Sequence, residues 1–538
     1  MAERLYLYDT TLRDGQQTMG VDFSVEQKQV ISLALNDLGV DYVEGGWPGA
    51  NPTDSGFFRM TPILPRATMT AFGMTNRPGV SASNDPVLAE VLNAKTPAVC
   101  LVGKTHDFHV TTALGVSLEE NLIAIRQSIG HLVQKGREAL FDCEHFFDGY
   151  KANPDYARDC VRTALEAGAR WIVLCDTNGG VMPEEARTIV AEIARIAPGT
   201  KLGIHTHNDT EQAIAVGLAA IDAGVRQIQG TLNGLGERCG NMNLVSLIPT
   251  LVLKEPYASA YETGVSKEKL PELTRISRLI DTILNRAPNR HAPYVGVSAF
   301  AHKAGLHASA VAKDPTTYEH VPPETVGNER IIPISNQAGR SNLIKRLSES
   351  GIYLEKDDPR GAELLTLVKE REDQGYAYDE AEASFTLLAH RHLGTAPSYF
   401  HVDRYRVIVE RRFNANNQLV TVSEAVVAVE VDGVRKISVA ENLDTGAGTE
   451  DGPVDALYTA LTMDLGRYQS HMNDLRLVDY KVRILTTGTE AVTRVLIESA
   501  DSRGRWTTVG VSSNIMDASF QALNDAVITK LMRDGAKP

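Results

Sequence analysis

An apolar, β-rich segment followed by a helix-like stretch recurs eight times between residue 5 and about residue 255. The eight apolar segments begin at Leu5, Val40, Ala67, Ala98, Ala139, Trp171, Lys201 and Gln227. Eight strands of parallel-sheet character, each followed by a helix, are typical of a closed (β/α)8 TIM barrel. An open, doubly wound sheet is the alternative, because periodicity does not report closure. No GxGxxG motif follows the first strand, which weakens a dinucleotide-binding form of that alternative.

Changes in the predicted secondary structure along the sequence divide the 538 residues into three predicted domains. Residues 1–260 form the barrel. Residues 261–395 form a mostly helical linker subdomain that contributes to the active site, with helices expected over 267–283, 336–348 and 362–375. In residues 396–538 a hairpin-like pair followed by a helix occurs twice, ending once in VDALYTAL and once in MDASFQAL. This repeat predicts a compact α+β domain. It carries no catalytic-looking residue, so we expect it to regulate or dimerise the protein rather than serve only as a structural appendage.

Charge and cysteine content exclude several classes of protein. The formal net charge of −14 argues against a nucleic-acid binder, which needs a basic face. Five cysteines without a CxxC pair are expected to be free thiols in a reducing compartment. The chain has no apolar segment of signal-peptide or membrane-spanning length, so a cytoplasmic protein without a membrane partner is expected. An acidic protein that binds an anionic substrate must supply positive charge within its site.

Two histidines end the seventh predicted strand, in the sequence HTHND from His205 to Asp209. Side chains two residues apart on a strand face the same side, so His205 and His207 should both point into the barrel mouth. With a carboxylate from another strand, they make a set that holds a divalent metal and leaves positions open for substrate. A lone core histidine is usually structural, whereas this pair favours a ligand set. Zn, Mn, Mg and Co all accept such ligands, so the metal stays open.

Polar residues also stand at the carboxyl ends of other predicted strands, where barrels hold their catalytic groups. They are Arg13 and Asp14 after the first strand, Glu44 at the second, Glu144 at the fifth, Thr177 at the sixth, and a loop with three glycines at 234–241. Each alone can be a rim residue, an ion pair or a tight turn, but together they indicate a site. A metal that holds a 2-oxo acid makes its keto carbon electrophilic, and Arg13 can neutralise the developing oxyanion.

Three motifs together carry a resemblance to a known family. DTTLRDG, HTHND and GLGERCGN resemble the metal-dependent barrel lyases and synthases that include 2-isopropylmalate synthase, homocitrate synthase and hydroxymethylglutaryl-CoA lyase. The resemblance covers nearly the whole chain, including FAHKAGLHASA in the helical middle and a C-terminal domain similar to the allosteric domain of 2-isopropylmalate synthase. The stretches YLYDTTLRDGQQTMGVDFS and YVEGGWPGANPTD are most similar to the longer, bacterial-type citramalate synthase branch.

The resemblance implies roles for individual residues. The metal ligands would be Asp14, His205 and His207, with Asn241 as a fourth ligand or a neighbour. Around the substrate, Arg13 would contact the keto oxygen, Glu44 would orient Arg13 or a metal-bound water, and Thr177 would receive the 2-oxo-acid carboxylate.

The same resemblance implies that Glu144 and His307 activate acetyl-CoA. The counterpart of His307 can reach a neighbouring subunit's site, which implies a homodimer. His302, five residues earlier, is interpreted as a neighbour rather than the base. His106 and His109 either line the mouth or are ordinary loop residues.

The implied reaction condenses acetyl-CoA with pyruvate and hydrolyses the thioester, giving citramalate and CoA for isoleucine biosynthesis. The duplicated C-terminal domain suggests feedback control by isoleucine. A bulkier or dicarboxylic 2-oxo acid, as in 2-isopropylmalate or homocitrate synthase, is the nearest alternative, because the sequence does not reveal which side chains line the pocket.

Two further readings are weaker. Acyl-CoA cleavage, as in the lyase and aldolase members, uses a cysteine in the glycine loop. Cys239 lies in that loop, but in the GERCGN context typical of the synthases, and cleavage enzymes generally lack the C-terminal domain. A non-catalytic metabolite sensor would be expected to have lost at least one member of the ligand set.

Overall fold

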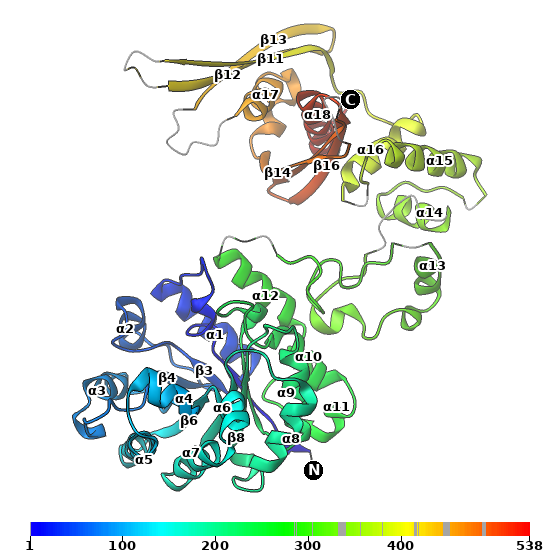
Figure 1. The fold of residues 1–538 in the computed structure, drawn as a ribbon. Coiled ribbons are helices and arrows are strands. Elements are labelled where there is room, and N and C mark those ends of the chain that lie inside the picture. Colours follow the sequence, from blue (N-terminus) through cyan, green and yellow to red (C-terminus); the bar gives the residue numbers. More distant parts are fainter. Residues whose placement is uncertain are drawn as a thin grey trace. The chain divides into compact units, whose positions relative to one another are not determined.

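Figure 1 shows the computed structural model of the chain. It describes residues 2–538 except 285, 287, 304, 332–339, 356, 379, 414–416, 418, 445–451 and 487–490. The chain separates into two compact units. The first comprises Met1–Phe300 with His320–Arg330, and the second comprises Ala301–Glu319 with Ile331–Pro538.

Eight parallel strands form the closed barrel of the first unit, and each strand pairs with the next one along the chain. The strands are β2 Tyr6–Asp9, β3 Tyr42–Glu44, β4 Thr68–Met74, β5 Ala98–Lys104, β6 Glu138–Glu144, β7 Trp171–Asp176, β8 Leu202–Thr206 and β9 Gln227–Gly230. Strand β9 returns to pair in parallel with β2, which closes the sheet. The predicted barrel is therefore confirmed, and the open sheet is excluded.

Helices surround the barrel on its outside (Figure 1). The main ones are α1 Val25–Leu38, α2 Pro52–Arg59, α3 Pro86–Asn93, α5 Leu118–Gln134, α7 Pro154–Glu166, α8 Pro183–Ile193, α9 Ala213–Asp222 and α10 Leu244–Leu253. Helix α1 begins with a capping box between Ser24 and Gln27 and ends at Gly39, whose φ of 106° only glycine adopts readily. The described helices include none that is both long and apolar enough to cross a membrane.

The barrel interior is filled by large side chains. Tyr8, Tyr42, Phe72, Leu140 and Trp171 form this inner core, which is separate from the apolar shell between strands and helices. A barrel packed in this way is not a pore, and its polar side chains are left to gather at the carboxyl ends of the strands.

The helical middle of the chain is shared between the two units. Helix α12, Glu272–Ile283, belongs to the first unit, whereas α13 Gly305–Lys313, α14 Arg340–Glu349, α15 Pro359–Asp373 and α16 Glu382–His392 belong to the second. Helices α12, α14 and α15 correspond to the three predicted helices. Residues 336–339 of the second prediction lie outside the described residues. Helix α12 starts later than predicted because Lys267–Lys269 forms a separate 3-10 turn.

The C-terminal part of the chain consists of two successive repeats, each with three antiparallel strands and a helix. The first contains β11 His401–Phe413, β12 Leu419–Val431, β13 Val434–Asp444 and α17 Pro453–Thr462; the second contains β14 Arg476–Ile484, β15 Thr493–Asp501, β16 Gly504–Ser512 and α18 Ile515–Arg533. Their inner faces share one apolar core. The predicted internal repeat is confirmed, with one more strand in each copy than the sequence pattern indicated.

Candidate active site

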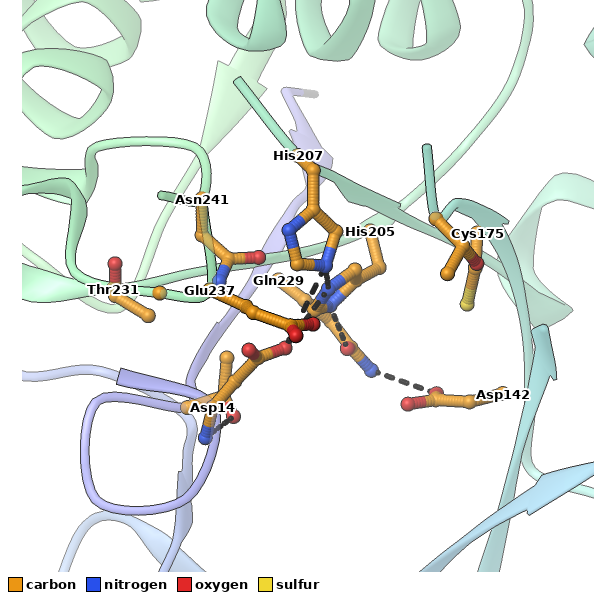
Figure 2. A network of polar contacts seen from close by, with 12 residues as sticks. Asp14, Asp142, Cys175, His205, His207, Gln229, Thr231, Glu237 and Asn241 are labelled. Atoms are coloured by element: carbon orange, nitrogen blue, oxygen red, sulfur yellow. Dashed lines mark hydrogen bonds and ion pairs between the residues drawn. The ribbon is translucent and has the colours of Figure 1, made fainter. Parts of the chain in front are cut away.

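Asp14, His205 and His207 meet at the carboxyl end of the barrel (Figure 2). Nε2 of His205 lies 3.2 Å from Oδ2 of Asp14, and Nε2 of His207 lies 3.9 Å from the same oxygen. The two Nε2 atoms are 3.4 Å apart, and all three side chains are buried. Two imidazoles and a carboxylate at this spacing are a donor set for a divalent cation. The three residues predicted as ligands thus lie together.

Two buried oxygen atoms at this cluster lack hydrogen-bond partners among the described residues, which bears on whether a metal fits there. They are Oδ1 of Asp14 and Oδ1 of Asn241. A buried oxygen without a partner is unfavourable, and a cation coordinated here would remove that penalty. Figure 2 shows the Asn241 side chain beside His207 and Asp14. The residues present therefore fit a bound divalent metal, with Asn241 next to the three-residue cluster.

The charges of the cluster are strongly coupled in the metal-free protein. Burial alone would raise the pKa of Asp14, but Arg13 and the two imidazoles hold that pKa well below its ordinary range. Burial also opposes a charged His205, yet the adjacent Asp14 carboxylate outweighs it and raises the pKa of this imidazole. Burial and the neighbouring His205 lower the pKa of His207 to about 4. His207 is therefore neutral at physiological pH, as a metal ligand must be.

Arg13 lies beside the cluster and is held by Glu44. Its Nε donates to Oε2 of Glu44 at 2.7 Å, and its Nη1 lies 3.2 Å from Oδ2 of Asp14. The guanidinium also packs over the ring of Phe72, 4.0 Å from the centroid. Glu44 is fully buried and accepts two further hydrogen bonds of 2.5 Å from hydroxyls on and after β2. Glu44 thus contacts Arg13, whose positive charge lies beside the Asp14 carboxylate of the cluster.

A cavity of about 270 Å³ opens over the cluster. One part of its wall is apolar or aromatic, and Trp47 meets Phe72 there edge to face at 5.6 Å between ring centroids. The other part is charged or polar. The lining residues are Arg13, Asp14, Gln17, Trp47, Phe72, Val102, Asp142, Glu144, Cys175, Thr177, His205, His207, Glu237 and Arg238. The cavity is slightly smaller than ordinary ligand pockets, which begin at about 300 Å³, and its wall includes both the Arg13 guanidinium and apolar side chains.

Thr177 lines this cavity. Its Oγ1 accepts a hydrogen bond of 2.8 Å from the backbone N–H of His145, so its own O–H is free to donate elsewhere. Arg238 makes hydrogen bonds of 2.8 and 3.0 Å to the Asp209 carboxylate and donates to the backbone carbonyl of Thr177. These two contacts fix a hydrogen-bond donor that suits the predicted role of receiving a carboxylate.

Glu144 and His307 belong to different units of the chain. Glu144 lines the cavity at the end of β6 and forms a 2.5 Å ion pair with Lys104. His307 is exposed on α13, where its ring centroid lies 4.2 Å from that of Tyr318. Their joint action on acetyl-CoA stays a prediction.

The other histidines named from the sequence have local partners. His302 lies in the second unit, with its Nε2 3.1 Å from Glu319. His106 pairs with Asp107 at 3.0 Å, and the ring of His109 stacks on that of His145 at 4.0 Å. None of these three lines the cavity over the Asp14–His205–His207 cluster.

Four residues at the site are not singled out by the sequence pattern. Asp142 precedes Glu144 by two positions on β6, so a second carboxylate on the same strand face was the available signal. Glu237 lines the cavity, and Figure 2 shows its side chain directed toward the cluster. Gln229 and Lys104 have no such signal, because their contacts depend on how neighbouring strands align.

Family models match the chain along most of its length. The HMGL-like model matches residues 4–280, the homocitrate synthase post-HMGL domain-like model matches 294–375, and the LeuA allosteric (dimerisation) domain model matches 380–531. A closed parallel barrel with a buried Asp-His-His cluster at its carboxyl end, followed by these two domains, defines the class as HMGL-like condensing acyltransferases.

Full-length relatives define the branch within this class. The (R)-citramalate synthase of Aquifex aeolicus is 46% identical over 538 residues, covering 99% of both chains. That of Geobacter sulfurreducens is also 46% identical, covering 98% of this chain and 97% of its own. A probable 2-isopropylmalate synthase of Methanopyrus kandleri is 31% identical, covering 97% of each. The chain belongs to the (R)-citramalate synthase family.

Proposed function

We propose that this chain condenses acetyl-CoA with pyruvate and hydrolyses the resulting thioester, giving (R)-citramalate and CoA. The observation that carries this proposal is the buried Asp14–His205–His207 cluster beneath a small cavity, in a chain 46% identical end to end to (R)-citramalate synthases. All five cysteines are free thiols in the structure, which is consistent with an enzyme that acts in the reducing cytoplasm.

The proposed metal site consists of Asp14, His205 and His207, with Asn241 as a fourth ligand or a close neighbour. A divalent metal held there, whether Zn, Mn, Mg or Co, would polarise the keto group of the 2-oxo acid. The protein places its own donors around that group. The Thr177 hydroxyl donates to the substrate carboxylate, and the two charges of metal and Arg13 make a local positive centre in an otherwise acidic protein.

Arg13 faces the oxygen that becomes negative when the keto carbon is attacked. Its guanidinium is held in advance by Glu44, so little reorganisation is needed when the charge develops. Preorganised donors of this kind contribute roughly 3–4 kcal/mol to a barrier. The role proposed for Glu44 is therefore to position Arg13 rather than to contact substrate.

Glu144 and His307 are the proposed groups that remove a methyl proton from acetyl-CoA. The carbanion so formed attacks the keto carbon, a C–C bond forms, and the keto oxygen takes the negative charge and then a proton. Water next adds to the thioester carbonyl, and CoA leaves as the thiol. A positioned base of this type accelerates proton transfer by about 10²–10⁴-fold.

Pyruvate is favoured over larger 2-oxo acids because the cavity is small and its apolar wall contains two aromatic rings. Each additional methylene in a close-fitting pocket changes discrimination by roughly 1–3 kcal/mol. The experiment is to reconstitute the protein with metal and measure thiol release from acetyl-CoA with pyruvate, 2-oxoisovalerate and 2-oxoglutarate in turn. We expect kcat/KM for pyruvate to exceed the others by ~10²-fold or more.

Two results of this panel would reject the proposal. A preference for 2-oxoisovalerate would indicate 2-isopropylmalate synthase activity, and a preference for 2-oxoglutarate would indicate homocitrate synthase activity. Thiol release that is independent of any 2-oxo acid would indicate simple hydrolysis.

A homodimer is proposed, with the outer face of the β11–β12–β13 sheet as its contact surface. The paired residues Val426 and Val439 lie on this face, as do Ala428 and Ile437. Ile437 and Val439 are 52% and 51% exposed although apolar. The corresponding face of the β14–β15–β16 sheet differs, because its Leu496 packs against the core around α15 and α16. The same face also carries the ion pair between Arg406 and Glu424. Exposed apolar side chains beside charged ones, in a domain of the dimerisation type, suit a second copy of this chain.

Isoleucine is the effector proposed for the C-terminal domain, which the LeuA allosteric model matches. The test measures initial rates with and without isoleucine in the full chain and in a chain ending at residue 395. We expect inhibition of the full chain only. Equal inhibition of both would contradict a regulatory role for this domain.

A further inference from the structure

A hydrogen-bonded chain runs behind the metal ligands from Asp142 through Gln229 to His205 (Figure 2). Nε2 of Gln229 donates to Oδ1 of Asp142 at 3.1 Å, and Oε1 of Gln229 lies 2.9 Å from ring Nδ1 of His205. The three side chains are 3%, 0% and 4% exposed, respectively. His205 and Gln229 are register partners on β8 and β9, so the backbone itself holds the two side chains side by side.

The order of donors and acceptors along these hydrogen bonds follows from the chemistry of Asp142. An ionised carboxylate only accepts hydrogen bonds, so Asp142 turns the amide nitrogen of Gln229 toward itself and the amide oxygen toward His205. An imidazole nitrogen that faces a carbonyl oxygen must carry the proton. Nδ1 of His205 therefore carries a proton whatever the charge of the ring, which leaves Nε2 as the nitrogen that can bind a cation. That Nε2 atom faces Oδ2 of Asp14 at 3.2 Å, where the cation would be held.

The second imidazole has no comparable support. Nδ1 of His207 is buried and lacks a hydrogen-bond partner among the described residues. The protein thus fixes the proton on Nδ1 of one imidazole, His205, before a metal arrives, and makes no such contact with Nδ1 of His207 in the described part of the chain. Gln229 is the only group in hydrogen-bond contact with Nδ1 of His205 in the described part of the chain.

We propose that Gln229 is a positioning residue for the metal: it holds His205 in the tautomer that ligates, and Asp142 holds Gln229 in the required orientation. The inference rests on the proposed metal site and does not depend on which 2-oxo acid is the substrate. Groups that orient a ligating histidine typically change metal affinity by about 10–100-fold when they are removed.

The experiment compares variants of two glutamines on the same strand. Gln229→Met keeps the side-chain length but has no acceptor oxygen. Gln227→Met is the matched control, because Gln227 lies two residues earlier on the same face of β9, is fully buried, and has no hydrogen-bond partner among the described residues. Gln229→Glu keeps an oxygen toward His205, and Asp142→Leu removes the group that orients the amide. Metal-free, full-length proteins are titrated with Co²⁺ by calorimetry at pH 7.5, and thermal unfolding of each metal-free protein checks its fold.

We expect Gln229→Met to raise the Kd for Co²⁺ by ~10–100-fold, and Asp142→Leu to raise it in the same direction. Gln227→Met and Gln229→Glu should stay within about 3-fold of the parent or bind more tightly. The inference is overturned if Gln229→Met and Gln227→Met bind Co²⁺ equally well while the parent binds it. Should Gln229→Met fail to fold, an unchanged Kd in Asp142→Leu overturns it instead. Failure of the parent chain to take up Co²⁺ would reject the metal site itself.

Discussion

Nε of Arg13 donates to Oε2 of Glu44 at 2.7 Å, inside a pocket where Glu44 has no solvent exposure. This contact fixes a guanidinium next to the Asp14–His205–His207 cluster. Glu44→Gln removes the charge that orients Arg13 but keeps the shape of the side chain. We therefore expect kcat to fall by ~10²-fold, with a much smaller change in KM for pyruvate, in a thiol-release assay at saturating metal.

Glu138→Gln is the control for that substitution. Glu138 accepts a 2.5 Å hydrogen bond from the hydroxyl of Tyr42, much as Glu44 accepts one from Tyr8, but it lies at the start of β6, at the opposite end of the barrel. Its kcat should stay within about 2-fold of the parent, because it does not contact Arg13. Equal losses in the two variants would mean that barrel stability, not the position of Arg13, limits the rate.

Val102 offers a direct test of the apolar wall. This residue of β5 lines the cavity and is partly buried. Val102→Ala enlarges the space available to the substrate's alkyl group, so the ratio of kcat/KM for 2-oxobutyrate to that for pyruvate should rise ~10-fold. Initial rates with the two acids measure this ratio. An unchanged ratio would show that Val102 does not face the alkyl group.

Asp176, at the end of β7, makes stability depend on pH. Burial raises its pKa from 3.8 to about 6. The folded protein therefore binds this proton more tightly than the unfolded chain does, so the contribution of Asp176 to stability is greatest below about pH 4 and declines as the pH rises to about 6. The ionised carboxylate then disfavours folding at pH 7 by roughly 2–3 kcal/mol.

Asp176→Asn should remove that dependence. The Asp176 carboxylate accepts hydrogen bonds from the backbone N–H groups of Gly180 and Val181. Asparagine keeps an acceptor oxygen for these bonds. Urea unfolding at pH 4.5 and pH 7.0 should show the variant to be more stable than the parent at pH 7.0 by roughly 1–3 kcal/mol. Asp159→Asn, at an exposed ion pair with Arg162, is the control and should change little. If Asp176→Asn lost as much stability between pH 4.5 and pH 7.0 as the parent protein does, this explanation would be wrong.

The dimer surface is tested by a charge on the outer face of the first C-terminal sheet. Ile437→Lys places an ammonium at the centre of the proposed contact, so the dimer should dissociate at micromolar concentration in analytical ultracentrifugation. Val434→Lys is matched to it, because Val434 is 56% exposed on the same strand but pairs with Val431, whose side chain faces the core. If the Ile437→Lys protein dissociated no more than the Val434→Lys protein, the dimer interface would lie elsewhere.

The barrel could be predicted from the sequence because its signals are local. Each strand is a short segment of the sequence, and a helix follows it before the next strand begins. Ser24, Gln27 and Gly39 mark the ends of the first helix by short-range hydrogen bonding and backbone conformation. The histidine pair could be predicted for the same reason, since residues two apart in extended backbone face the same side, and His207 directly follows the end of β8.

Contacts between strands could not be predicted in this way. His205 meets Gln229 because β8 and β9 align at those residues, and Gln229 reaches Asp142 across 87 positions of sequence. The Lys104–Glu144 ion pair likewise depends on the register of β5 with β6, where the two residues are partners. Register follows from barrel closure as a whole, and no single segment encodes it. The sequence therefore indicates the ligands but not the groups that orient them.

Metal stoichiometry tests the central claim most directly. Metal-free protein should take up one equivalent of Co²⁺ per chain and gain thiol-releasing activity with it, whereas His205→Ala and His207→Ala should take up none at the same concentration. His131→Ala, on helix α5 and outside the site, should match the parent. Stoichiometric Co²⁺ binding by both histidine variants, at the affinity of the parent, would contradict the account.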